Sequence, residues 1–90
     1  MKEYKVTYSA CSMYNRDDEW SFHQAENSEQ AIEMAIKDRK EMSIDAYGED
    51  DMDVSKMEIV DRAFKNGFAI YYDDELQDWF TDFKAEELIN

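Results

Sequence analysis

Proline is absent from the sequence, and glycine, cysteine and histidine are almost absent. The two glycines, Gly48 and Gly67, stand far apart, whereas a phosphate-binding loop needs several glycines close together. This excludes the usual nucleotide enzymes. The single cysteine, Cys11, allows neither an intramolecular disulfide nor a zinc site built from several cysteines. It agrees with a reducing compartment, so we expect a cytoplasmic protein.

Long apolar runs and linker-like stretches are also missing. No run of about 18 apolar residues occurs, which is the length at which a helix can begin to span a bilayer. We therefore expect a soluble protein with no membrane partner. No low-complexity tract divides the chain, and 90 residues fall within the size of one domain. The sequence predicts a single domain over residues 1–90.

Positive charge is scarce. Ten lysines and arginines face 23 aspartates and glutamates, which gives a formal net charge of −13. This balance argues against direct binding to nucleic acid and favours a basic partner. Such an excess can serve solubility alone, but it also makes the folded chain repel itself. Because duplex DNA carries a negative charge about every 1.7 Å of its axis, a compact acidic protein can imitate DNA.

The residues that could support catalysis or metal binding form no convincing motif. Cys11 and His23 are the only thiol and imidazole, and no glycine-rich or helix-start element near Cys11 supplies oxyanion donors. The acidic stretch 45–53 lacks the glycine and glutamate that an EF-hand loop needs at fixed positions. We expect no enzyme activity, no cofactor and no metal.

The first 25 residues show the alternation of a β-hairpin. Tyr4, Val6 and Tyr8 alternate with polar residues, and so do Trp20 and Phe22, as in half-buried strands. The polar stretch 14–18 between them reads as a connecting loop. The sequence predicts two antiparallel strands here.

A helix is predicted over residues 28–42. Asn27 and Gln30 have the spacing of a capping box, and an apolar stripe follows at helical spacing, with Ala31, Ile32 and Ala35 among its members. Gly48 and the acidic run 49–53 then mark the loop that ends the helix.

Residues 54–66 allow two interpretations. The pair Asn66-Gly67 is a strong hairpin turn signal, which would make the segment a strand. Val54, Met57 and Val60 instead fall on one helical face with Ala63 and Phe64, so we predict a helix with Gly67 closing it. Whether this segment is helix or strand stays open.

The last third of the chain contains an extended segment and a predicted helix. Residues 68–72 are rich in β-forming residues and form a candidate third strand. Asp74 and Gln77 repeat the capping-box spacing, and Leu76, Trp79, Phe80 and Phe83 have helical spacing. We therefore predict a helix over residues 74–86.

Together these elements predict an α+β fold. Its expected form is an antiparallel β-hairpin, or a small three-stranded sheet, packed with two to three helices. The expected core consists of Tyr4, Val6, Trp20, Phe22, Ile32, Ile36, Val60, Phe64, Trp79, Phe80 and Phe83.

Several short runs carry a resemblance to a known family. They are Ala-Phe-Lys-Asn-Gly-Phe at 63–68, Tyr-Asp-Asp-Glu at 72–75, Glu-Leu-Ile-Asn at 87–90, and residues 2–9 near the start. In these runs the chain resembles a small phage-encoded type II-A anti-CRISPR inhibitor. The resemblance implies a non-enzymatic DNA mimic that acts in the cytoplasm of a host cell. Such an inhibitor binds the guide-loaded type II effector nuclease at the site that reads the protospacer-adjacent motif and blocks target DNA.

The resemblance also implies partner-binding residues. Asp73, Asp74 and Glu75 match the acidic run that meets the motif-reading basic residues, Tyr72 matches an interface tyrosine, and Glu3 matches an acidic contact beside the first strand. The implied partner is the basic DNA-binding surface of the nuclease with its guide RNA, contacted by a monomer.

Two features depart from the family. Its first short helix is missing here, and its central strands give way to the helix at 28–42. Its acidic loop has no clear counterpart, although residues 17–19 or 49–53 could substitute. The alternatives are another acidic phage or host protein, such as an antirestriction factor or a regulator of a basic nucleic-acid enzyme, and, as the weakest, a small enzyme.

Overall fold

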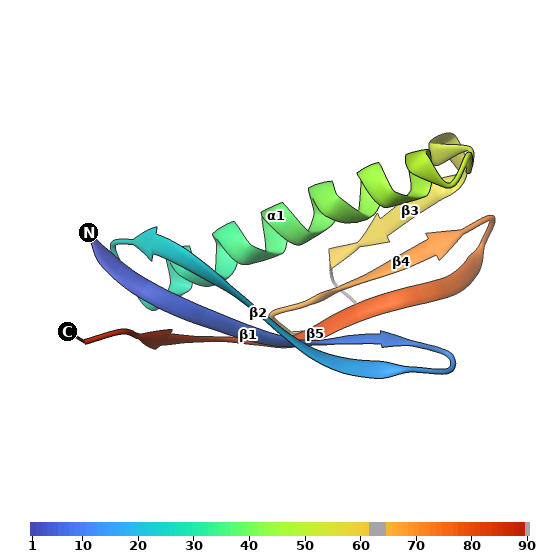
Figure 1. Cartoon of the computed structure of the whole chain (residues 1–90). Coiled ribbons are helices and arrows are strands. Elements are labelled where there is room, and N and C mark those ends of the chain that lie inside the picture. The colour runs from blue at the N-terminus through green and yellow to red at the C-terminus, as the bar shows by residue number, and fades with distance from the viewer. Residues whose placement is uncertain (62–64, 90) are drawn as a thin grey trace.

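The computed structural model describes residues 1–61 and 65–89 and consists of one long helix packed on one face of a twisted five-stranded sheet (Figure 1). The strand order is β2-β1-β5-β4-β3, and every neighbouring pair is antiparallel. The elements are β1 (Lys2–Ser12), β2 (Arg16–Ala25), α1 (Ser28–Glu49), the 3₁₀ turn η1 (Val54–Lys56), β3 (Met57–Val60), β4 (Phe68–Tyr72) and β5 (Glu75–Glu87). The prediction of two to three helices on a small sheet was wrong.

The structure confirms the predicted β1–β2 hairpin, but β2 begins at Arg16, within the predicted loop 14–18, and its opposite face is turned towards the core. Tyr4 lies opposite His23, and Cα partners in an antiparallel pair place their side chains on the same face. Tyr4 and His23 therefore both point towards α1 and are buried. Trp20 and Phe22 lie on the other face, where they are 60% and 56% exposed. Their assignment to the core was wrong.

Helix α1 begins where the sequence predicts and ends later. The side chain of Asn27 accepts a hydrogen bond of 2.8 Å from the Gln30 N–H, and the buried Ala31 and Ala35 let the helix approach the sheet closely. Gly48 lies inside the helix, which continues to Glu49. An isolated glycine is tolerated in a helix, and the predicted end at residue 42 was therefore premature.

The predicted helix at 54–66 is replaced by η1 and β3 in the described residues. β3 pairs with β4, placing Ile59 opposite Ile70, so Ile59 packs against the core in an extended conformation. Ala63 and Phe64 lie outside the described residues. The third strand predicted at 68–72 is confirmed as β4.

The predicted helix at 74–86 is the long strand β5. Asp82 has a φ of 60°, close to an irregularity in the pairing with β1 between Thr7 and Ser9. Such a bulge adds one residue and shifts the alternation of faces. It brings Phe80 and Phe83 into the same buried cluster. These two residues are three positions apart, a spacing that is typical of one face of a helix.

The core lies between α1 and the sheet and is rich in stacked aromatic rings. Tyr8 stacks on Phe83 with ring centroids 4.5 Å apart, and Phe68 stacks on Phe80 at 4.9 Å. Of the predicted core, Tyr4, Val6, Phe80 and Phe83 are buried, while Ile32, Ile36, Val60 and Trp79 are half-buried. The molecule is elongated, with principal extents of 44 × 21 × 21 Å.

Candidate protein-binding surface

Two acidic segments far apart in the sequence meet at one end of the molecule, which we call the acidic pole. It consists of Glu49, Asp50, Asp51 and Asp53, which close α1 and lead into η1, and of Asp73, Asp74 and Glu75 at the turn between β4 and β5. All seven side chains are exposed. Figure 1 shows the end of α1, η1 and the β4–β5 turn together at the end of the molecule opposite the two termini.

Tyr72 links the two halves of the acidic pole. Its hydroxyl oxygen accepts a hydrogen bond of 3.2 Å from the Asp53 N–H, and its ring lies 6.0 Å from that of Tyr47 in an edge-to-face arrangement. The Asp73 N–H donates to the Lys56 carbonyl at 3.1 Å. The half-buried Tyr72 therefore positions the carboxylates from both segments.

The β4–β5 turn consists of two aspartates in the left-handed backbone region. Asp73 has a φ of 52° and Asp74 a φ of 66°, between the paired residues Tyr72 and Glu75. Two consecutive positive φ values in a two-residue hairpin loop are typical of a type I′ turn, which prefers Asn-Gly. The predicted helix start at Asp74 is thus a hairpin turn, and it presents its carboxylates at the tip.

The segment that closes α1 repeats this pattern. The Met52 N–H donates to the Tyr47 carbonyl and the Asp51 N–H to the Gly48 carbonyl, as in a Schellman motif. Asp51, with a φ of 58°, occupies the position at which glycine is usual. Glu49 and Asp50 also stand at the negative end of the helix dipole, where carboxylates are unfavourable.

Asp53 is held in its ionised form by its own turn. The Ser55 hydroxyl donates to Asp53 Oδ1 at 2.6 Å and the Ser55 N–H donates at 3.0 Å. These hydrogen bonds, the hydroxyl one foremost, lower the pKa of the Asp53 carboxyl. The acidic pole therefore keeps this charge in mildly acidic solution.

Glu3 is not part of the acidic pole. It lies near the start of β1, where its carbonyl accepts a hydrogen bond of 2.8 Å from the Leu88 N–H. Figure 1 places this region, with both termini, at the other end of the long axis. Of the predicted site residues, the structure brings together Tyr72, Asp73, Asp74 and Glu75, and it separates Glu3 from them.

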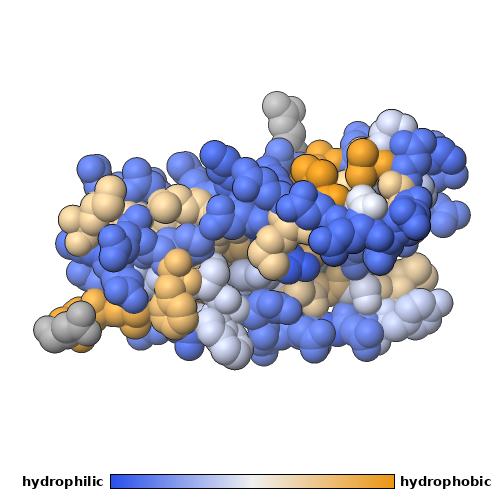
Figure 2. Space-filling model, turned by 45° about the horizontal axis from the view of Figure 1, so that its top comes forward, coloured by the Kyte–Doolittle hydropathy of each residue, from blue (hydrophilic) through white to orange (hydrophobic). Residues whose placement is uncertain are grey.

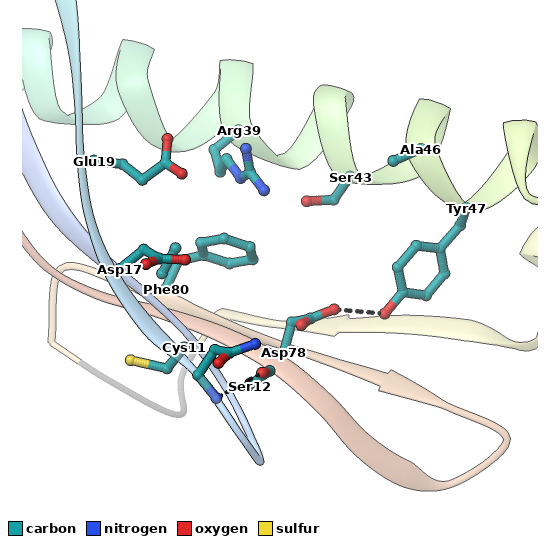
Figure 3. Close-up of a pocket in the computed structure, with 12 residues that line it drawn as sticks. Cys11, Ser12, Asp17, Glu19, Arg39, Ser43, Ala46, Tyr47, Asp78 and Phe80 are labelled. Carbon is teal, nitrogen blue, oxygen red and sulfur yellow. Dashed lines mark hydrogen bonds between the residues drawn. The ribbon is translucent and has the colours of Figure 1, made fainter.

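A cleft of about 290 Å³ lies between α1 and the sheet, beside the β1–β2 hairpin (Figure 3). Asp17 and Glu19 of β2 and Asp78 of β5 line it. The Tyr47 hydroxyl donates to Asp78 Oδ2 at 2.9 Å. Burial, together with this carboxylate neighbour, raises the pKa of Tyr47. Neither Asp78 nor Tyr47 was predicted as a site residue, because nothing in the sequence places them together.

Arg39 is the cation of this cleft. Its guanidinium lies over the Phe80 ring, 4.6 Å from the centroid, which is a favourable cation–π distance. Its Nε is buried and has no hydrogen-bond acceptor among the described residues. Figure 3 shows Arg39 and Ser43 reaching from α1 towards the sheet.

The thiol and the imidazole lie far from each other. Cys11 pairs with Arg16 at one end of the β1–β2 hairpin, and His23 pairs with Tyr4 at the other. Seven residue positions along a strand correspond to about 23 Å, too far for a nucleophile and its base. His23 instead contacts Ser21 Oγ at 2.7 Å and lies 3.8 Å from Asp38.

Carboxylates cover much of the molecular surface. All 23 acidic residues are described, and all but Glu19 and Asp78 are exposed. Figure 2 shows a largely hydrophilic surface on the side that carries α1, with apolar residues in small separate groups. In residues 1–61 and 65–89, no three potential ligand side chains gather closely enough to hold a metal ion.

No helix in the described part of the chain has both the length and the apolar character needed to cross a membrane. No known family, curated protein or solved structure matches the chain.

Proposed function

We propose that the protein is an acidic inhibitor that mimics DNA and occupies the DNA-binding surface of a nucleic-acid enzyme. The target indicated by the sequence resemblance is a guide-loaded type II CRISPR effector nuclease, at its site for the protospacer-adjacent motif. The acidic pole is the contact surface in this proposal. Tyr72 holds the two acidic segments together through its hydrogen bond with Asp53. Asp73, Asp74 and Glu75 contact the basic residues of the nuclease.

The observation that carries the proposal is the presence of aspartate where the backbone favours glycine or asparagine. Asp51, Asp73 and Asp74 all have positive φ and all lie at the acidic pole. A non-glycine residue in this region is strained, and adjacent like charges add repulsion. Natural sequences depart from local preference mainly where function requires it. Negative charge at this pole is therefore retained at a cost in stability.

The overall charge supports mimicry of DNA. At one charge per 1.7 Å, a duplex as long as the 44 Å axis carries about 26 phosphate charges. The protein presents 23 carboxylates on the same length, nearly all exposed. A basic channel shaped for DNA therefore meets a comparable number of negative groups.

The chemistry of the turn fits recognition by arginine. Effector nucleases read their motif with guanidinium groups that fork onto base edges, and carboxylates accept the same bidentate geometry. Asp73 and Asp74 place two neighbouring carboxylates at the tip of the β4–β5 turn. A partner that also contacts Glu3 must extend along the long axis of the molecule.

The decisive variant changes charge without disturbing the turn. Replacing Asp73 by Asn and Asp74 by Gly installs the preferred type I′ sequence, so the fold is expected to gain stability. Cleavage of a target duplex by the guide-loaded nuclease is then measured with increasing amounts of each protein. The natural chain should inhibit, and Asp73→Asn/Asp74→Gly should lose at least about tenfold in potency because two charged contacts are removed.

The matched control removes two carboxylates elsewhere. Glu33 and Glu41 are exposed on α1, away from the acidic pole, and the variant Glu33→Gln/Glu41→Gln should keep its potency. Equal potency of both double variants would exclude the acidic pole as the contact. Undiminished cleavage with the natural chain, across several nuclease orthologues, would exclude the nuclease and leave another basic nucleic-acid enzyme as the target.

A further inference from the structure

Strand β2 forms an open edge of the sheet. It pairs with β1 over ten consecutive residue pairs without a bulge, and in the described sheet its other side has no neighbouring strand. Natural edge strands are usually protected by charged side chains, especially lysine, by proline, by bulges or by short length. β2 is ten residues long and contains neither proline nor lysine, and its charged residues all lie at positions 16–19. The edge from Trp20 to Ala25 is therefore available for pairing with another strand.

The outward-facing backbone groups of β2 can be assigned from the hairpin. The Ser12 N–H donates to the Asn15 carbonyl at 2.8 Å, which makes this pair hydrogen-bonded. Hydrogen-bonded and non-bonded pairs then alternate along the ladder. The N–H and C=O groups that point away from β1 therefore belong to Arg16, Asp18, Trp20, Phe22 and Gln24.

The same residues place aromatic side chains on the sheet face that α1 leaves uncovered. Trp20 is 60% exposed and Phe22 is 56% exposed. Lys5 on β1 lies over the Trp20 ring at 5.4 Å from its centroid. A second strand laid along this edge would cover both aromatic rings and satisfy the backbone groups.

We propose that two copies of the chain pair through their β2 strands, antiparallel about a two-fold axis at Ser21. In this register Trp20 lies opposite Phe22 of the second copy. Arg16 lies opposite Glu26, the residue that follows β2, and these two pair through their side chains because the Glu26 N–H already donates to Gln30. Asp18 lies opposite Gln24, so no like charges face each other directly. Moving the axis to Trp20 would place Asp18 opposite Phe22 and lose these complementary pairs, which is why we assign the axis to Ser21.

The result is a continuous ten-stranded sheet. Residues opposite each other in an antiparallel pair place their side chains on the same face, so both helices lie on the same side of this sheet. The monomer expected from the sequence is then the dissociated form. The β4–β5 turn of the acidic pole does not belong to this edge, because β1 lies between β2 and β5, and it stays exposed in the dimer. The pairing does not depend on the proposed function.

The first test measures molar mass by sedimentation over a range of protein concentrations in moderate salt. The natural chain should shift from monomer to dimer. Gln24→Pro removes an N–H that points away from β1, at a position where an edge strand tolerates proline. Because the two-fold axis repeats the change in both copies, two hydrogen bonds are lost, and dimerisation should weaken about tenfold or more. Val54→Lys, an exposed apolar residue remote from β2, should leave dimerisation unchanged.

The second test addresses the register. Arg16→Glu and Glu26→Arg should each weaken the dimer, and the double variant should restore it, because the pair is exchanged across the axis. In a Cys11→Ser background, Ser21→Cys should form a disulfide-linked dimer under mild oxidation. A natural chain that stays monomeric at all concentrations, or that forms dimers unaffected by Gln24→Pro, would overturn the proposal. Circular dichroism of each variant verifies the fold.

Discussion

At the scale of single residues, the most informative positions are the aspartates in left-handed conformation. Among the described residues, the non-glycine positions with positive φ are Asp51, Asn66, Asp73, Asp74 and Asp82. Asparagine and aspartate adopt this conformation more easily than other residues with a Cβ, but glycine does so with the least strain. Each aspartate here trades some stability for a charge at a defined place.

Asp51→Gly should stabilise the fold. Glycine removes the strain at this Schellman position and one charge from the negative end of α1, with a gain of about 1 kcal/mol. For a domain of this size that corresponds to a rise of roughly 4–8 °C in the unfolding temperature. Asp50→Gly is the matched control, because Asp50 carries the same charge with a φ of −82°. Calorimetry should show no comparable rise for Asp50→Gly, and equal rises would attribute the effect to charge alone.

Tyr47 gives the molecule a sensitivity to alkaline pH. Burial first, and then Asp78, raise the pKa of Tyr47 above its ordinary value of 10.0. The folded state therefore holds this proton more tightly than the unfolded state. Its contribution to stability is complete below pH 10 and declines as the pH rises above 10.

Tyr47→Phe should reduce this alkaline loss. At neutral pH the variant should be less stable by about 1 kcal/mol, because the half-buried Asp78 loses its hydrogen-bond donor. Denaturant unfolding of both proteins at neutral pH and above pH 10 measures the effect. The difference in unfolding free energy between the two proteins should narrow at alkaline pH. A difference that stays constant would show that unfolding does not change the protonation of Tyr47.

At the scale of elements, the sequence determines the β1–β2 hairpin, β4 and the start of α1 better than it determines β3, β5, the helix end and the faces of the strands. Asn27 has a capping side chain, so the start of α1 is local information. The face of β2 depends on its register with β1, which places His23 rather than Phe22 against α1. Register is a property of the pair of strands, and alternation within one strand cannot reveal it.

The error over β5 has a different origin. Leu76, Trp79, Phe80 and Phe83 have helical spacing, but in the strand only Phe80 and Phe83 are buried. The bulge at Asp82 gives these two their spacing of three residues. The turn before it contains no glycine, so the usual hairpin signal is missing. Of the candidate site, the acidic run 73–75 was identifiable from sequence. Its contact with residues 49–53 through Tyr72 depends on the tertiary fold.

The close packing of α1 on the sheet depends on small residues. Ala31 and Ala35 are 0% and 2% exposed, which leaves no room for a larger side chain. Ala35→Leu should therefore destabilise the fold by about 1–3 kcal/mol through overpacking. Chemical denaturation measures the loss. Glu33→Leu, on the exposed side of the same helix, should change the unfolding free energy little. An equal loss of stability in both variants would mean that α1 does not pack on the sheet through Ala35.

At the scale of the whole molecule, the net charge of −13 acts on folding and on binding in opposite directions. The charges repel one another in the compact state and attract a basic partner. Salt screens both effects, with a screening length of about 10 Å at 0.1 M. Acidic residues outnumber lysines and arginines by 23 to 10, so the two effects share one cause.

Added sodium chloride should therefore raise the unfolding temperature and weaken binding to the basic target. Thermal unfolding and inhibition of cleavage, each measured over the same salt series, provide the comparison. The variant Glu33→Gln/Glu41→Gln should show a smaller salt-induced rise, because it starts with less repulsion. An unfolding temperature that falls with salt would mean that ion pairs, rather than repulsion, dominate the surface.

The position of β5 in the sheet affects how the chain folds. It is the single strand that joins the β1–β2 hairpin to the β3–β4 hairpin, and its residue Ala85 pairs with Val6 near the beginning of the sequence. Contacts between segments so far apart require closure of a long loop, which slows folding. An isolated two-stranded hairpin is marginally stable at best, so the sheet becomes one cooperative unit only when β5 inserts between the two hairpins.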